Sequence, residues 1–339
     1  MHWKAVNKES INGPNAKKEE KTLRGRNLWL AGMMGLIVGD ALGDPVQFMS
    51  REEVRCRKQG PVTGMEPAEQ FGMPEGAWTD DSSLALATAD SILTLGRVDP
   101  EDIMERFVSW LEDGAYTPLG VAFDIGNTCM TSIKAYEVSR DVRTCGGTSV
   151  WANGNGSLMR ILPVCLYAAE CDLAVEEAVA LVESVGGLTH AHLRAGIACG
   201  LYYFCVRAVL QGRSSLKSAL KVGLEEGFRF YERDILNRAE LAHYGRLRDL
   251  ETFGKTPESD IRSSGYVVDS LEAAVWSLVR SDSYKECLLT AVNLGDDADS
   301  VGAIAGGLAG LFYGYDAIPE EWRSAIIRRE WIEELLQKE

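Results

Sequence analysis

Apolar residues recur at helical spacing through most of the chain, in segments that Gly, Pro, Asp or Asn interrupt. Alternating apolar and polar residues, which indicate half-buried strands, are scarce. The pattern therefore predicts an all-α fold. The clearest helix start is Asp99, a candidate N-cap, followed by Pro100 and an apolar stripe from Ile103 to Leu111. Helices are expected at about 28–43, 82–96, 158–169, 173–185, 191–211, 214–232, 267–280, 283–293, 300–313 and 319–337.

Two of the expected helices contain apolar segments rich in glycine, at 32–43 and 302–310. A glycine inside a helix costs about 1 kcal/mol relative to alanine, so several in one helix indicate close approach by another helix or by a ligand. We therefore expect these two helices to pack at the centre of the molecule. Residues 27–339 contain no linker-like stretch, which favours one compact domain.

The first 26 residues differ from the rest of the chain. Seven Lys or Arg against three Glu give residues 1–26 a balance of +4, and little in them could be buried. Because the whole chain has a formal net charge of −15, the remainder carries −19. This acidic balance argues against nucleic acid as a partner and fits a cationic substrate, bound cations or plain solubility. Residues 1–26 are interpreted as a polar extension that is either flexible or partner-binding.

The sequence also bears on the cellular compartment. No apolar run after the basic segment has the form of a secretory signal, and no run of about 18 apolar residues predicts a membrane span. The eight cysteines form no CxxC pair and fall mostly in apolar helical patterns. They are typical of reduced, buried thiols, so we expect a cytoplasmic protein with no membrane partner.

Two acidic clusters stand at expected helix starts. The first, Thr79-Asp80-Asp81, comes shortly before the amphipathic segment Leu84 to Leu95. On its own it has an ordinary interpretation, because Asp and Thr cap free N–H groups at helix starts. The second, Asp296-Asp297-Ala298-Asp299-Ser300, precedes the second glycine-rich segment. Three carboxylates within four residues repel one another unless cations neutralise them.

If the two clusters meet in space, they present an all-oxygen set with four negative charges, which balances two divalent ions. The set is Thr79, Asp80, Asp81, Asp297, Asp299 and Ser300. Such oxygens suit Mg²⁺ or Mn²⁺, and paired metals can orient a reacting group and acidify a bound water. Spacing alone leaves two unrelated capping motifs as an equal alternative.

Two further features are ambiguous on their own. The segment Gly154-Asn155-Gly156-Ser157 precedes an apolar helix, so its N–H groups could hold ribose and diphosphate oxygens. A plain turn followed by an N-cap has the same composition. His190, at another expected helix start, is by itself a cap or a surface residue.

Six segments together resemble the ADP-ribosylglycohydrolase family, including the dinitrogenase-reductase-activating glycohydrolases, over nearly all of residues 30–320. They are 35–43, 78–81, 124–127, 154–160, 188–190 and 295–304. The resemblance implies a compact, single-domain all-α fold with a central dinuclear metal site held by the six-residue oxygen set, which leaves Asp296 aside. The substrate contacts that it implies are Asn155, Gly156, Ser157, His190, Asp124 and Gly126.

The resemblance also implies an activity, the removal of ADP-ribose from a modified protein side chain, with arginine as the expected acceptor. Asp80 or Asp81 would take the proton of a water activated by the metals. The implied partners are ADP-ribose and an ADP-ribosylated protein. Some family members are immunity proteins, so residues 1–26 could block a cognate ADP-ribosyltransferase toxin. A non-catalytic ADP-ribose binder is a third hypothesis.

One position departs from the family pattern. The family often has Pro-Val-Glu-Phe where this chain has Pro45-Val46-Gln47-Phe48. Glutamine can accept a hydrogen bond, but it cannot act as a carboxylate base. We therefore expect reduced but measurable hydrolysis, with partial compensation if Asp44 points into the site.

Overall fold

The computed structural model describes residues 14–337, with side chains from residue 27 onward, and over that range the chain is all-α, as predicted. Its β-bridges are isolated residue pairs outside any strand. The helices are α1 Pro14–Gly43, α2 Arg51–Cys56, α3 Asp80–Leu95, α4 Pro100–Asp113, α5 Asn127–Ser139, α6 Leu162–Glu170, α7 Val175–Gly186, α8 Leu193–Leu210, α9 Leu216–Tyr231, α10 Ile235–Leu241, α11 Leu250–Phe253, α12 Val267–Val279, α13 Tyr284–Val292, α14 Ala298–Tyr313, α15 Glu320–Ala325 and α16 Arg329–Leu336.

The expected helices are present, and the differences have local causes. Asp99 caps α4 as expected, because its side chain accepts hydrogen bonds from the first-turn N–H groups. The segment expected as one helix at 319–337 is two, because α15 ends where Ile326 becomes extended, with a ψ of 121°, and Arg328, with a φ of 57°, precedes α16. Helices α2, α10 and α11 are too short for periodicity to show, and α5 was not among the expected helices.

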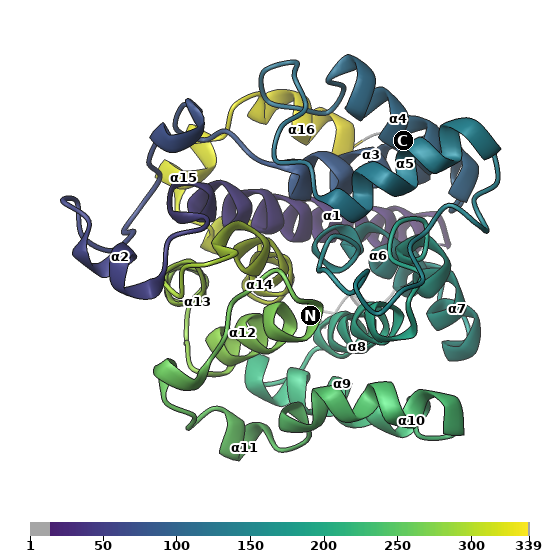
Figure 1. The fold of residues 1–339 in the computed structure, drawn as a ribbon. Coiled ribbons are helices and arrows are strands. Elements are labelled where there is room, and N and C mark those ends of the chain that lie inside the picture. The colour runs from purple at the N-terminus through teal and green to yellow at the C-terminus, as the bar shows by residue number, and fades with distance from the viewer. Residues whose placement is uncertain (1–13, 338–339) are drawn as a thin grey trace, which may run out of the picture.

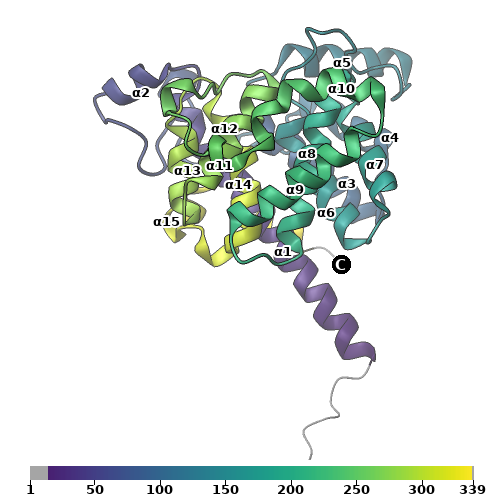
Figure 2. The ribbon, with the colours of Figure 1, turned by 90° about the horizontal axis from the view of Figure 1, so that it is seen from below.

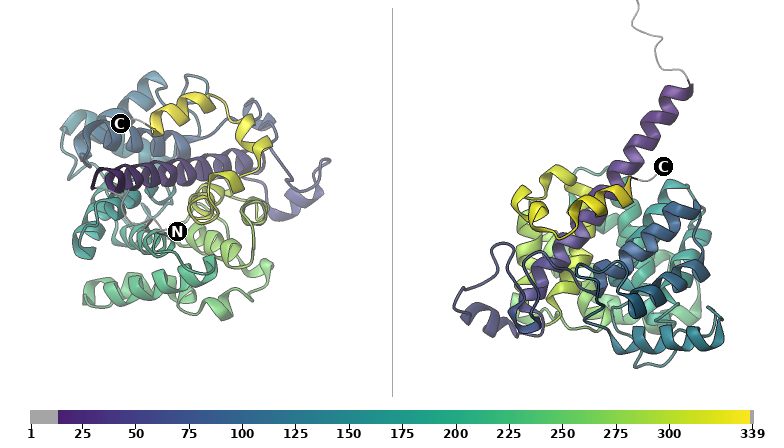
Figure 3. Two further views of the ribbon diagram at one scale, coloured as in Figure 1. Left: turned by 180° about the vertical axis from the view of Figure 1, so that it is seen from behind. Right: turned by 90° about the horizontal axis from the view of Figure 1, so that it is seen from above.

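The two glycine-rich helices pack against each other, which confirms the expectation from the sequence. Helix α1 runs through the middle of the molecule, and α14 lies against it (Figures 1 and 3). A Cβ on Gly39 would lie 2.0 Å from the carbonyl oxygen of Gly302, and one on Gly302 would lie 2.2 Å from that of Gly39. The same exclusion recurs one turn away, between Gly35 and Gly306. No larger residue fits at these positions, so glycine sets the distance between the two helices.

This packing also fixes where helix ends meet. A Cβ on Gly43, the last residue of α1, would lie 2.3 Å from the backbone nitrogen of Asp299 in the first turn of α14. The backbone N–H of Thr79, which precedes α3, donates to the Asp40 carboxylate of α1 at 3.1 Å. The two acidic clusters are therefore brought together around the C-terminal end of α1.

The N-terminal part of the chain continues α1. The helix begins at Pro14, earlier than the expected residue 28, so residues 14–26 of the predicted extension are helical, and residues 1–13 lie outside the described residues. Figures 2 and 3 show this part of α1 projecting from the body of the molecule. A flexible or partner-binding role for residues 1–26 stays a prediction.

Two expectations about apolar residues need adjustment. Helix α8 is long and apolar enough to cross a membrane, although the sequence analysis expected no such segment. However, 72% of this helix is buried inside the fold, as in a core helix of a globular protein. The cysteines are free, and most are buried as expected, but Cys56 and Cys171 are exposed.

Candidate functional site

A cavity of about 370 Å³ lies where the two acidic clusters meet. All of the predicted site residues line it except Thr79 and Ser157, which are fully buried. The predicted lining residues are Asp80, Asp81, Asp124, Gly126, Asn155, Gly156, His190, Asp297, Asp299 and Ser300. Residues that the sequence analysis did not assign to the cavity also line it, and these are Gln47, Phe48, Asn127, Thr128, Cys129, Trp151, Gly154, Met159 and Gly265.

The first cluster is held by a carboxylate that the sequence analysis missed. Asp40 accepts hydrogen bonds from the N–H groups of Thr79 and Ser82 and from both of their hydroxyls. Thr79 is the N-cap of α3, and its hydroxyl accepts from the N–H of Asp81. Capping therefore explains Thr79, and it also fixes the carboxylates of Asp80 and Asp81 at the cavity. The sequence signals for Asp40 are a charge inside an otherwise apolar, glycine-rich helix and its place in segment 35–43, which resembles the family.

The second cluster enters the cavity from the start of α14. The Asn155 amide donates to Asp297 Oδ2 at 2.5 Å and to Ser270 Oγ at 2.9 Å, which links the 154–157 turn to this cluster. Both carboxylate oxygens of Asp299 and one of Asp81 are buried without a hydrogen-bond donor. Asp296 is exposed and does not line this cavity.

The buried carboxylates raise one another's pKa values. Burial is the largest cause, and the charges of neighbouring carboxylates add to it, so the pKa values of Asp80, Asp81 and Asp299 lie well above their usual range. Burial raises the pKa of Asp297 to about 6, and hydrogen bonds from Asn155 oppose the rise. In the absence of cations, burial and mutual repulsion therefore favour the protonated forms of these carboxyls.

The donor set suits hard divalent cations, although the side chains do not form a finished metal site. Among residues 27–337, no three His, Cys, Asp or Glu side chains already converge on one point as metal ligands do. The buried oxygens of Asp81 and Asp299 nevertheless lack donors, and an unpaired buried carboxylate is costly. The side chains of the predicted metal-binding set ligate through oxygen atoms, which Mg²⁺ and Mn²⁺ prefer. The residues therefore fit the predicted ions, which stay a prediction.

Gln47, the departure from the family pattern, lies at this cavity. Its side-chain nitrogen donates to Asp124 Oδ2 at 2.6 Å, and its carbonyl oxygen is buried without a partner. Asp124 has a left-handed backbone, with φ of 52°, so the contact lies at a strained position. Asp44 is buried but does not line the cavity, and burial together with Asp40 and Asp124 raises its pKa to about 8.

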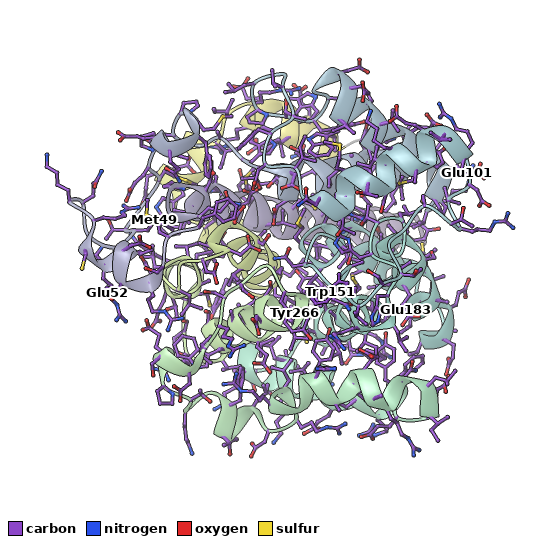
Figure 4. The ribbon with its side chains drawn as sticks, in the orientation of Figure 1. Met49, Glu52, Glu101, Trp151, Glu183 and Tyr266 are labelled. Atoms are coloured by element: carbon purple, nitrogen blue, oxygen red, sulfur yellow. The ribbon has the colours of Figure 1, made fainter. Side chains whose placement is uncertain are left out.

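The 154–157 turn is anchored on the start of α12. Gly154 forms an antiparallel bridge with Tyr266, and the N–H of Asn155 donates to Gly265 O at 3.0 Å. Trp151, just before the turn, lines the cavity although its side chain is 91% exposed, and Figure 4 labels it near Tyr266. Ser157 packs behind the cavity, where it accepts from the Cys199 thiol at 3.6 Å.

His190 packs against the 154–157 turn. A Cβ on Gly156 would lie 2.8 Å from its ring carbon Cε1, so glycine allows the imidazole to pack against the backbone. The ring is 3% exposed, and burial, with a smaller effect of the Arg160 charge, lowers its pKa to about 3. His190 is therefore a neutral group at the cavity. Arg160 and Thr189, which contact each other behind it, were not predicted as functional.

The chain matches known proteins over nearly its whole length. The family profile described as ADP-ribosylglycohydrolase matches residues 21–338. A solved structure titled "ADP-ribosylglycohydrolase-related protein complex" superposes with a TM-score of 0.73 at 31% identity, covering 93% of this chain and 97% of that one.

Two named relatives are similar in sequence. The "ADP-ribosylarginine hydrolase Tri1" of Serratia proteamaculans (strain 568) is 30% identical over 306 residues, which are 90% of this chain and 77% of the relative. The "ADP-ribosyl-[dinitrogen reductase] glycohydrolase" of Rhodospirillum rubrum is 32% identical over 297 residues, which are 88% of this chain and 89% of the relative. With the all-α fold and the acidic cavity, these matches show that the chain is a hydrolase of the ADP-ribosylglycohydrolase family.

Proposed function

We propose that this protein is a metal-dependent hydrolase that removes ADP-ribose from modified arginine side chains and so reverses mono-ADP-ribosylation of a protein. The observation that carries the proposal is the set of buried carboxylates from α3 and α14 lining one cavity with donor-free oxygens. The arginine linkage is supported by the name of the Serratia relative, an ADP-ribosylarginine hydrolase.

The residues that would hold two divalent ions, Mg²⁺ or Mn²⁺, are Thr79, Asp80, Asp81, Asp297, Asp299 and Ser300. Bound there, such ions would supply Lewis acidity and lower the pKa of a coordinated water. Asp80 or Asp81 would accept that water's proton. The bond from ribose C1 to the guanidinium nitrogen breaks as the water oxygen bonds to C1, and the departing guanidine takes up a proton.

The turn and His190 would bind the rest of the ligand. The N–H groups at Asn155 and Gly156 can donate to ribose and diphosphate oxygens, and Asp124 and Gly126 line the same cavity. Ser157 would support the turn from behind. The acidic balance of residues 27–339 would attract the cationic arginine of the substrate and repel a polyanion such as nucleic acid.

The experiment follows release of ADP-ribose from an ADP-ribosylated arginine protein, with and without chelator. We expect release that chelator abolishes and that added Mg²⁺ or Mn²⁺ restores. The Asp299→Asn variant should lose release, while a Glu286→Gln variant, changed on the exposed side of α13, should keep it. Binding of ADP-ribose without any release would make the protein a non-catalytic binder.

A second function, inhibition of a cognate ADP-ribosyltransferase toxin, is favoured by the projecting N-terminal part of α1 (Figure 2). Such a segment could cover the active site of a partner. The basic balance of residues 1–26 would suit an acidic surface there. Removal of residues 1–25 should then abolish inhibition and leave hydrolysis intact, and unchanged inhibition would refute the idea.

The buried thiols support a cytoplasmic location, which cell fractionation tests.

A further inference from the structure

The orientation of the His190 ring is set by the turn beside it. A Cβ on Gly154 would lie 3.3 Å from Nε2, so this nitrogen faces the turn that lines the cavity. Within residues 27–337, Nε2 has no hydrogen-bond partner. The other ring nitrogen, Nδ1, lies 2.9 Å from the hydroxyl oxygen of Thr189. The ring therefore presents one nitrogen to the cavity side and commits the other to the protein.

The direction of the Thr189 contact follows from a third residue. Arg160 Nη2 donates to Thr189 Oγ1 at 2.9 Å, and a guanidinium can only donate. The oxygen of the hydroxyl is thus already an acceptor, and a hydroxyl polarised by a cation is a stronger donor of its own proton. The best acceptor within reach of that proton is the unprotonated imidazole nitrogen. This polarisation favours the arrangement in which Thr189 donates to a bare Nδ1 and the ring proton lies on Nε2.

A competing arrangement has to be weighed. Burial raises the pKa of the Cys129 thiol to about 12 and the Thr189 hydroxyl opposes this rise, so the sulfur is a second candidate acceptor for the hydroxyl proton. If Thr189 donated to Cys129, its oxygen could accept a proton from His190 Nδ1, and Nε2 would be left bare. Sulfur is a weak acceptor compared with an imidazole nitrogen, so this arrangement is the less stable one.

The burial of Arg160 supports a role beyond packing. Arg160 has no exposed surface, stacks 4.7 Å from the centre of the Phe107 ring, and leaves Nε and Nη1 without acceptors. A buried cation with unpaired donors is costly, and an apolar residue would fill the same space at lower cost. Its charge also disfavours a second proton on His190. Burial is the main reason that the ring stays neutral, the Arg160 charge adds to this effect, and Arg160 directs, through Thr189, where the single ring proton lies.

We propose that Arg160 and Thr189 are positioning residues that hold His190 as a neutral ring with its proton on Nε2, which donates to an oxygen of the bound ligand. The identity of that ligand as ADP-ribose rests on the proposed function. A donor whose direction is fixed in advance needs no reorganisation on binding, and its strength does not change with pH across the neutral range.

The first experiment observes the tautomer directly and needs no ligand. Nitrogen-15 NMR of histidine-labelled protein distinguishes a protonated ring nitrogen from a bare one, and the chain has only four histidines, so a His190→Gln variant assigns the signal. We expect a protonated Nε2 in the parent and in Thr189→Ser, which keeps the hydroxyl. Thr189→Val, which has the same shape without the hydroxyl, should give a mixture of tautomers.

Matched controls separate the hydroxyl from general disturbance of the core. Ser132, also buried, donates to the backbone oxygen of Thr189 at 3.0 Å, so Ser132→Ala removes a neighbouring hydroxyl and should leave the tautomer unchanged. Cys129→Ala should also leave it unchanged. A shift of the proton in Cys129→Ala would show that Thr189 donates to sulfur and would overturn the proposal, even if Thr189→Val failed to fold.

The second experiment measures binding of ADP-ribose by calorimetry. We expect about tenfold weaker binding for Thr189→Val, the size of one good hydrogen bond, with affinity recovered in Thr189→Ser. A proton on Nδ1 in the parent protein, or an unchanged tautomer in folded Thr189→Val, would overturn the proposal. If the parent fails to bind ADP-ribose, the proposed function is wrong while the NMR result still decides the tautomer.

Discussion

Replacement of Gln47 by glutamate tests both the electrostatics of the cavity and the departure from the family pattern. In the parent, the Gln47 amide donates to Asp124 at 2.6 Å in a place where Gln47 is only 4% exposed. Glutamate offers no donor unless it is protonated. The variant therefore replaces a charge-assisted hydrogen bond by two buried carboxylates that must share a proton, bind a cation or repel.

The magnitude follows from the loss of that contact. A hydrogen bond to a charged group contributes about 1.5–3 kcal/mol, and the added repulsion increases the loss. For a domain of this size, each kcal/mol lowers the melting temperature by roughly 2 °C, so we expect metal-free Gln47→Glu to melt roughly 4 °C or more below the parent. The shared proton raises a carboxyl pKa in the folded state, so this loss should shrink as the pH falls from 7 towards 5.

The assay is thermal unfolding in chelator and in Mg²⁺, together with the rate of ADP-ribose release. Added Mg²⁺ should stabilise Gln47→Glu more than the parent, and the release rate should rise. Gln70→Glu is the matched control, since Gln70 is exposed and donates only to the backbone oxygen of Asp44. Equal melting temperatures for parent and Gln47→Glu in chelator would refute the electrostatic reasoning. An unchanged release rate would show that this position does not limit hydrolysis.

Three further predictions follow from the geometry. Gly39→Ala should destabilise the fold by about 3 kcal/mol or more, because its Cβ meets a backbone oxygen of α14 at 2.0 Å, whereas Gly245→Ala, in open space, should be nearly neutral in chemical unfolding. Because burial raises the pKa of Asp44 to about 8 and of Asp297 to about 6, the folded state binds the extra protons. Metal-free protein should therefore lose stability as the pH rises from 6 to 8, and a flat profile would contradict this. Trp151→Ala should weaken ADP-ribose binding by about tenfold at an unchanged melting temperature, and Trp151→Phe should restore it, as expected for an exposed ring that stacks on a base.

How much of the fold could be predicted from the sequence depends on which interactions are local in the chain. Helical periodicity and the Asp99 cap are local, and so were predicted, as was the central packing that the glycine-rich segments require. The break between α15 and α16 was missed, since neither the extended Ile326 nor the left-handed Arg328 leaves a pattern in the sequence. Short helices such as α2 and α11 span too few residues for a period to register.

The same distinction applies to the site. The two acidic motifs, together with the family resemblance, predicted ten of the nineteen residues that line the cavity, among them Asp80 and Asp299. Asp40 and Arg160 were missed because their roles depend on partners far away in the chain, such as Ser82 and Thr189. Nothing in a single sequence marks a buried charge inside an apolar helix as a support for a distant cluster.

The geometry of α1 and α14 connects the stability of the fold with the site. Gly39 and Gly302 allow backbone contact between the helices, and that contact brings the Asp40 and Asp299 carboxylates into one buried region. Burial of mutually repelling carboxylates opposes folding, so the apolar packing of these helices must offset it. A cation or a proton relieves the repulsion, and an Asp299→Asn change does so permanently. The cluster therefore lowers the stability of the metal-free protein, and the same donor-free oxygens are what would bind divalent ions.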